Sequence, residues 1–192
     1  MRNYKVVALI MLFWFVISFI TNILGPLIPD IISNFDLKQF TLAGYIPMSF
    51  FLAYAVMSIP AGIMIEKLSE KTVLLIGFTM PFIGSLLFAL IPCYPVLLAS
   101  CFIIGLGMAM LQTVINPLTR VAGGEENFAF FSVMGQLVFG FASFISPFVY
   151  SYLVRELTIP GTDKNFFINF LAGITPEQLP WVSLYKEVTK RV

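Results

Sequence analysis

The chain contains five long apolar runs, and their length decides what it can fold into. A helix needs about 20 mostly apolar residues to cross the hydrocarbon core of a bilayer, and every run reaches that length. Backbone groups in the bilayer must pair internally, which leaves only helices or a closed barrel. Barrel strands are alternating segments of roughly 10 residues, much shorter than these runs. The sequence therefore predicts an all-α integral membrane protein with about five transmembrane helices. The predicted helices are about 6–28, 42–65, 72–91, 96–118 and 128–154.

The composition agrees and excludes several functions. Hydrophobic residues make up 59% of the chain and charged residues 11%, against about 45–50% and about 25% in soluble domains. A net charge of +1 leaves no basic patch for nucleic acid. Histidine, the commonest metal ligand and general base, is absent, and Cys93 and Cys101 lack zinc spacing. We expect no enzyme, no nucleic-acid binding, no metal and no resident cofactor.

Basic residues predict how the helices are oriented. Arg2 and Lys5 precede the first run as in a signal peptide, but the run is long enough to span and further spans follow, so we expect a retained helix. With the N-terminus inside, the opposite side carries only Lys38 up to the fifth span. The positive-inside rule then predicts a multi-pass protein of a bacterial-type inner membrane with a cytoplasmic N-terminus. The basic residues on the cytoplasmic side would be Arg2, Lys5, Lys67, Lys71 and Arg120.

The remainder of the chain predicts two further parts. Residues 1–154 hold the five helices, and residues 155–180, with turn signals at Pro160-Gly161 and Thr175-Pro176, are expected to form an extracytoplasmic loop. Residues 181–192 begin like the interfacial start of a sixth helix, with Trp and Tyr at headgroup level. A polar tail then replaces the apolar residues that a crossing needs. We expect either a truncated chain or one that works differently from its relatives.

Polar and small residues recur at helical spacing in three of the runs. Polar groups inside membrane helices are costly and tend to face a cavity or a partner helix. For the serines and glycines, close helix packing is the simpler interpretation. Carboxamides offer both donors and acceptors, which suits a polyhydroxylated solute, so Asn22, Gln112, Asn116 and Gln136 are the candidate substrate-binding residues. The three stripes are Ser18, Asn22, Gly25 and Pro29; Gly105, Ala109, Gln112 and Asn116; and Ser132, Gln136, Gly140, Ser143 and Pro147.

Carboxylates are almost absent from the spans. Only Asp30 is present, at the end of the first run, where we expect an interfacial residue in water. Proton-coupled carriers usually relay protons through Asp, Glu or His inside the bundle.

The link between the second and third runs carries a motif. It reads Gly62-Ile63-Met64-Ile65-Glu66-Lys67-Leu68-Ser69-Glu70-Lys71. This resembles the signature loop of the major facilitator superfamily, in which a Gly is followed by an acid–base pair and a further basic residue. Glu66 stands where the family has Asp, and Ser69 replaces its second Gly. The resemblance implies a cytoplasmic gating loop, a charged clamp between helix ends, made by Gly62, Glu66, Lys67 and Lys71.

Two further segments narrow the resemblance. Ile59-Pro60-Ala61-Gly62 and Gln112-Thr113-Val114-Ile115-Asn116-Pro117 are similar to the fucose–proton symporter branch, which includes glucose/galactose carriers and whose fourth helix reads Glu-Thr-Ala-Ala-Asn-Pro. Asn22 also matches an Asn in that branch's first helix. The resemblance covers about residues 13–153 and implies the N-terminal half of a two-bundle sugar transporter that works by alternating access.

Two departures from the branch bear on coupling. The acids that the branch carries in its fourth and first helices fall on Gln112 and Gly25. Sugar can still hydrogen-bond to an amide, but protons cannot be relayed through these positions. The coupling ion is therefore Na+ or H+, with Na+ coupling or uniport favoured for this half.

Three functions remain open at this point. The preferred one is the N-terminal portion of a hexose-type sugar transporter, embedded in the lipid bilayer, whose second bundle comes from a longer parent chain or a partner. A half-transporter that assembles as a dimer is the second. A small non-transporting membrane subunit, using its stripes only as helix contacts, is the third.

Overall fold

The computed structural model describes residues 4–35 and 40–158. In these residues the fold is entirely helical, with no strand, and each of the five long helices is long and apolar enough to cross a membrane. The predicted all-α class with five spans is confirmed. The helices are α1 (Tyr4–Asn34), α2 (Phe40–Leu68), α3 (Glu70–Leu90), α4 (Tyr94–Gly123) and α5 (Phe128–Thr158), with a short 3-10 turn, η1 (Glu125–Asn127), between the last two.

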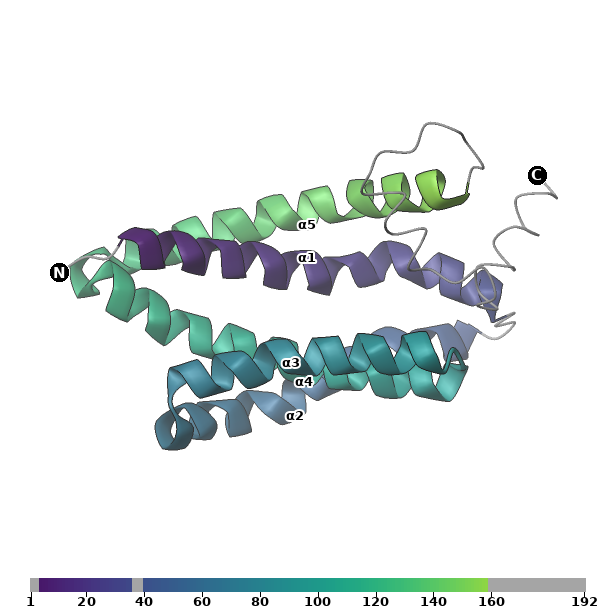
Figure 1. The fold of residues 1–192 in the computed structure, drawn as a ribbon, viewed down its shortest axis with the longest axis horizontal. Coiled ribbons are helices and arrows are strands. Elements are labelled where there is room, and N and C mark those ends of the chain that lie inside the picture. Colours follow the sequence, from purple (N-terminus) through teal and green to yellow (C-terminus); the bar gives the residue numbers. More distant parts are fainter. Residues whose placement is uncertain (1–3, 36–39, 159–192) are drawn as a thin grey trace.

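The helices form two groups joined by α4. Helix α1 lies along α5, while α2, α3 and α4 form the other group, and α4 crosses toward α5 at its C-terminal end (Figure 1). Half of the most apolar window of α4 is buried, against at most 28% in the other helices. Helix α4 is therefore the central element, and it also contacts α1.

Small residues let α4 approach its two neighbours closely. A Cβ added to Gly107 would lie 2.7 Å from the carbonyl oxygen of Gly77 on α3. A Cβ added to Gly105 would overlap the carbonyl oxygen of Phe50 on α2 and lie 2.8 Å from the Cβ of Ala53. Close approach of this kind supplies the van der Waals contact that holds helices together in lipid.

Helices α1 and α5 are joined differently, by side-chain hydroxyls. Ser18 Oγ donates to the carbonyl oxygen of Phe139 at 2.5 Å, and Ser146 Oγ donates to the carbonyl oxygen of Phe19 at 3.2 Å. Both serines are completely buried. One hydrogen bond thus runs in each direction across this interface.

Four helix ends lie beyond their predicted positions, those of α1, α2, α4 and α5, by three to six residues. The first span was expected to end near Pro29 and Asp30, but α1 continues through Pro26 and Pro29 to Asn34. Proline removes one N–H, and membrane helices tolerate this because nearby groups satisfy the freed carbonyl. Helix α5 reaches Thr158 and so includes the first four residues of the stretch 155–180 that was expected to form a loop. The rest of that loop and the predicted aborted helix at 181–192 lie outside the described residues.

Candidate functional site

Two of the four candidate carboxamides use their NH2 group on their own helix. Asn22 Nδ2 donates to the carbonyl oxygen of Ser18 at 2.8 Å, and Asn116 Nδ2 donates more weakly, at 3.5 Å, to that of Gln112. A carbonyl oxygen only accepts, so this contact fixes which way each amide points. No other described residue bonds either Oδ1 atom, and Asn116 is exposed while Asn22 is half-buried. Each amide therefore presents a free acceptor.

The two glutamines are less constrained. Gln112 is half-buried and Gln136 is exposed. Within the described residues neither side-chain amide makes a hydrogen bond. The helices of Asn22 and Gln112 pack against each other, but no hydrogen bond joins any two of the four candidates. They are thus open polar groups and not links between described helices.

The predicted stripes divide between packing and open positions. Gly105 and Ala109 are buried, with Gly105 against α2, whereas Gln112 and Asn116 further along α4 are partly or fully accessible. On α1, Ser18 is buried against α5, but a Cβ added to Gly25 would meet nothing within 4 Å. Packing, the expected role of the serines and glycines, therefore holds for some of them and not for Gly25.

The stripe predicted on α5 does not face α1. The α5 residues at the α1 contact include Gly135, whose added Cβ would meet the Trp14 indole, together with Ala142 and Ser146, which are buried. Gln136 and Gly140 are exposed, and a Cβ on Gly140 would meet nothing within 4 Å. Gln136 and Gly140 therefore belong to a different face of α5, while the hydroxyl of Ser132, from the same predicted stripe, is buried.

Sequence reasoning missed two hydroxyls between α1 and α2. Thr21 and Tyr54 lie close together with their oxygen atoms buried, and they form no well-formed hydrogen bond. The sequence offered one indication of this pair, because Thr21 directly precedes the candidate residue Asn22.

Asp30 has a partner that the sequence did not indicate. We expected a carboxylate in water at the end of the first span. Instead Tyr150 OH on α5 donates to Asp30 Oδ2, and Asp30 is half-buried. This contact is a third hydrogen bond between α1 and α5.

The motif between α2 and α3 folds as the tightest link of the bundle. Ser69 alone separates the two helices, with φ 110° and ψ 151°. Glu66, Lys67 and Lys71 are exposed, and among the described residues they make no ion pair. The predicted charged clamp is therefore not closed within this part of the chain.

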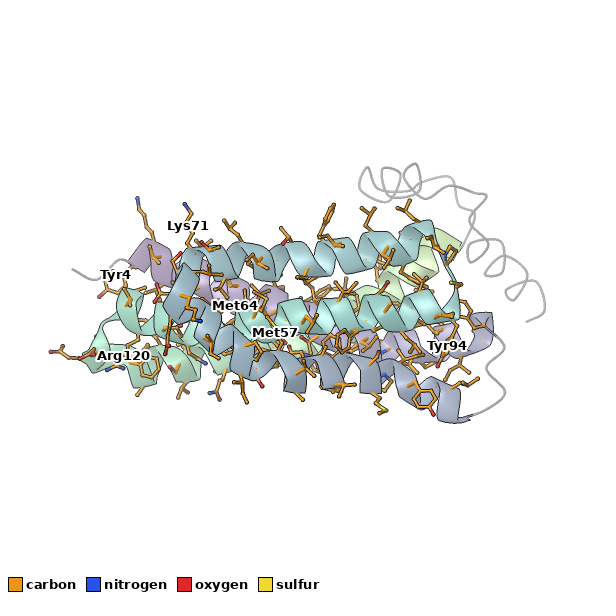
Figure 2. All side chains as sticks on the ribbon, turned by 90° about the horizontal axis from the view of Figure 1, so that it is seen from below. Tyr4, Met57, Met64, Lys71, Tyr94 and Arg120 are labelled. Atoms are coloured by element: carbon orange, nitrogen blue, oxygen red, sulfur yellow. The ribbon has the colours of Figure 1, made fainter. Side chains whose placement is uncertain are left out.

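Two of the basic residues expected on one side of the membrane, Lys71 and Arg120, lie at one end of the bundle (Figure 2). Tyr4, which precedes Lys5, lies at the same end as Lys71 and Arg120, and Tyr94 lies at the other (Figure 2). Arg120 pairs there with Glu125 at 2.6 Å, across the turn from α4 to α5.

Comparison with known proteins places these features in context. The profile of the Major Facilitator Superfamily matches residues 10–175. The chain is 31% identical to the L-fucose-proton symporter of Escherichia coli over 182 residues, which is 93% of this chain and 40% of that protein. It is 29% identical to a glucose/galactose transporter of Brucella abortus over 79% of this chain and 37% of that protein.

A solved structure gives the same result for the fold. The crystal structure of the Escherichia coli fucose:proton symporter superimposes with a TM-score of 0.67 and 28% sequence identity, over 96% of this chain and 44% of that one. The chain thus spans about 40% of the length of the relatives it matches. The predicted resemblance and the predicted fold, an incomplete N-terminal bundle, are confirmed.

Proposed function

Because the chain belongs to the major facilitator superfamily, we propose that it is the N-terminal portion of a secondary transporter for a hexose-type sugar. Two of its relatives are named for L-fucose and for glucose/galactose, which supports a sugar as the solute. Transport by alternating access needs a second bundle, with the site between the two bundles near the bilayer midplane. That bundle comes from a longer parent chain or a partner.

The free carboxamide groups carry this proposal. Asn22 and Asn116 each donate a hydrogen bond from Nδ2 to a backbone carbonyl oxygen of their own helix, and their Oδ1 atoms remain free. Within the described residues, the side-chain amide of Gln112 remains free at both ends. An unpaired amide is expensive in a water-free bilayer. Sugar hydroxyls donate and accept, so they satisfy exactly these groups by ordinary hydrogen bonds. Gln136 on α5 contributes from the opposite helix of the bundle.

In this half of the transporter, sugar transport is not coupled to the movement of a proton. Gly25 and Gln112 occupy the positions of the two acids of the symporter branch, and neither can carry a proton. The space beside Gly25 is open, so no neighbouring group takes over that position. Na+ coupling or uniport follows for this half.

The orientation follows from the shared end of the basic residues. Tyr4 at the start of α1, Lys71 beside the Ser69 link and Arg120 of the Arg120–Glu125 pair lie at one end (Figure 2), which we assign to the cytoplasm. Glu66, Lys67 and Lys71 are then available to clamp the second bundle when the cytoplasmic side closes.

Replacing Gln112 tests the proposed site. In the full-length reading frame that contains this chain, Gln112→Leu should weaken equilibrium sugar binding about tenfold, or about 1.4 kcal/mol, with little change in melting temperature. A polar contact that only packs helices is worth about 0.6 kcal/mol on average. Thr119→Val is the matched control, because Thr119 is buried on the same helix and its hydroxyl bonds only the carbonyl of Ile115.

The opposite result favours another function. If Gln112→Leu leaves affinity unchanged but lowers the melting temperature, the amide is helix packing. The chain would then be a structural membrane subunit, and the transporter proposal would fail. Sugar binding by the 192-residue chain alone, as a dimer, would instead identify a half-transporter.

A further inference from the structure

We infer that Ser18 is a positioning residue, which holds the Asn22 carboxamide so that the site accepts a hydrogen bond from one substrate hydroxyl. The inference rests on the proposed function, because it names how one of the proposed contacts selects its solute.

The geometry fixes the direction of each hydrogen bond. Ser18 Oγ lies 2.5 Å from the carbonyl oxygen of Phe139, which can only accept, so the Ser18 proton points to α5. The lone pairs of Oγ then face the Asn22 Nδ2 atom at 3.3 Å, and the Ser18 carbonyl oxygen lies 2.8 Å from the same nitrogen. Both hydrogens of the amide face acceptors of Ser18.

A flipped amide is excluded by the same contacts. It would set Oδ1 against the Ser18 carbonyl oxygen and against an Oγ whose proton is already used, so acceptors would face acceptors. The Asn22 Oδ1 atom is thereby held on the side away from Ser18. Since Ser18 is completely buried, water does not replace it in this role.

The consequence is a requirement on the substrate. The site binds a sugar whose hydroxyl donates a hydrogen bond to Asn22 Oδ1. An analogue with a hydrogen, a fluorine or a methoxy group on the same sugar carbon cannot donate this hydrogen bond. Sites built around a substrate hydroxyl reject analogues that lack it, because the buried partner stays unpaired. Ser18 therefore sets selectivity between a sugar and its deoxy or deoxyfluoro analogue without touching either.

Ser146 provides a matched control for helix packing. It is also completely buried, and its hydroxyl donates to the carbonyl oxygen of Phe19 at 3.2 Å, across the same α1–α5 interface. Within the described residues, Ser146 makes no hydrogen bond with a carboxamide. Ser18→Ala and Ser146→Ala each remove one hydroxyl between these helices, but only the first removes an acceptor of the Asn22 amide and leaves Nδ2 with the Ser18 carbonyl oxygen alone.

Binding measurements on the full-length protein separate the two roles. Using L-fucose, D-galactose and their monodeoxyfluoro analogues as probes, Ser18→Ala should lower affinity for the preferred sugar about three- to tenfold and should reduce discrimination against one analogue. Ser146→Ala should leave both unchanged, and Ser18→Thr, which keeps the hydroxyl, should restore them. In an Asn22→Ala background, Ser18→Ala should have no further effect. Additive losses, or equal losses from the two serine variants, would overturn the inference.

A second measurement does not depend on sugar. In the 192-residue chain in nanodiscs, labelled with 15N-asparagine and assigned through Asn22→Gln, the Asn22 side-chain amide resonances should shift in Ser18→Ala and stay in place in Ser146→Ala. An unchanged Asn22 amide in Ser18→Ala overturns the positioning role. A full-length protein that binds no sugar while this shift occurs would instead refute the proposed function.

Discussion

The backbone conformation of Ser69 leads to a quantitative prediction, because it lies in a region of φ and ψ that favours glycine. With φ 110° and ψ 151°, Ser69 occupies a region that is essentially restricted to glycine. Gly124, at the end of α4, has φ 81° and ψ 150° and is the matched natural glycine. We expect Ser69→Gly to stabilise the chain and Gly124→Ala to destabilise it.

The magnitude follows from three contributions. Relief of the backbone strain contributes about 1–3 kcal/mol. The greater freedom of glycine in the unfolded chain removes about 0.4–1 kcal/mol. The Ser69 hydroxyl also contacts the Thr72 hydroxyl at 3.1 Å, but both are exposed to water in this link, so its loss costs little. A net gain of about 1 kcal/mol corresponds to a rise of roughly 2–4 °C for a chain of this size.

Thermal unfolding followed by thiol labelling measures this change. Cys101 is buried and reacts with a maleimide dye only as the bundle opens, so a Cys93→Ser background gives a single reporter. Ser69→Ala is the control, because it removes the hydroxyl and keeps the strain. If Ser69→Gly melts at or below Ser69→Ala, or if Gly124→Ala is harmless, the argument from backbone strain is wrong.

Three other predictions concern packing, topology and coupling. Gly105→Ala should destabilise the bundle by about 1–3 kcal/mol because its Cβ overlaps the α2 backbone, whereas Gly140→Ala should be neutral; equal melting temperatures would contradict the interface. In a background without native cysteines, Ser69→Cys should resist an impermeant maleimide in intact cells and Thr162→Cys should react, and the reverse pattern would invert the topology. Gly25→Asp, which has open space around it, should make sugar uptake by the full-length protein sensitive to protonophore, and unchanged uptake would show that this position does not reach the coupling path.

The length of the apolar runs predicted the helices well, but not where they end. Hydrophobicity determines that a segment crosses the bilayer, and all five crossings were identified on that basis. The end of α1 was missed because proline was read as a stop, although Pro26 and Pro29 both lie inside the helix. In water the freed carbonyls would favour termination, whereas in a bundle neighbouring groups compensate for them.

The chemistry of the candidate residues could be read from the sequence, but the face of the helix on which each of them lies could not. Periodicity placed Gln136 and Ser143 on one stripe, while the α1 contact of α5 is made by Gly135 and Ser146. Which stripe meets a neighbour depends on the crossing of the two helices, and a single sequence does not contain that information. The conformation of Ser69, in contrast, was signalled by the glycine that the family has at this position.

Hydroxyls and carboxamides differ in how far the hydrogen-bonding groups of their own helix can satisfy them. Seven hydroxyls of the described residues donate their one proton to a carbonyl oxygen three or four residues back, whereas the hydroxyls of Ser18 and Ser146 donate to a neighbouring helix. The hydroxyls of Thr21, Tyr54, Ser100 and Ser132 are buried without a hydrogen-bond partner in the described part of the chain. A carboxamide cannot be satisfied by its own helix alone, because bonding its NH2 to the helix leaves its oxygen without a donor, as in Asn22 and Asn116. Backbone N–H groups of a helix are already used, so the missing donor must come from water, from another part of the protein or from a solute. The hydroxyls satisfied on their own helices are those of Ser33, Ser49, Ser58, Thr79, Ser85, Thr113 and Thr119.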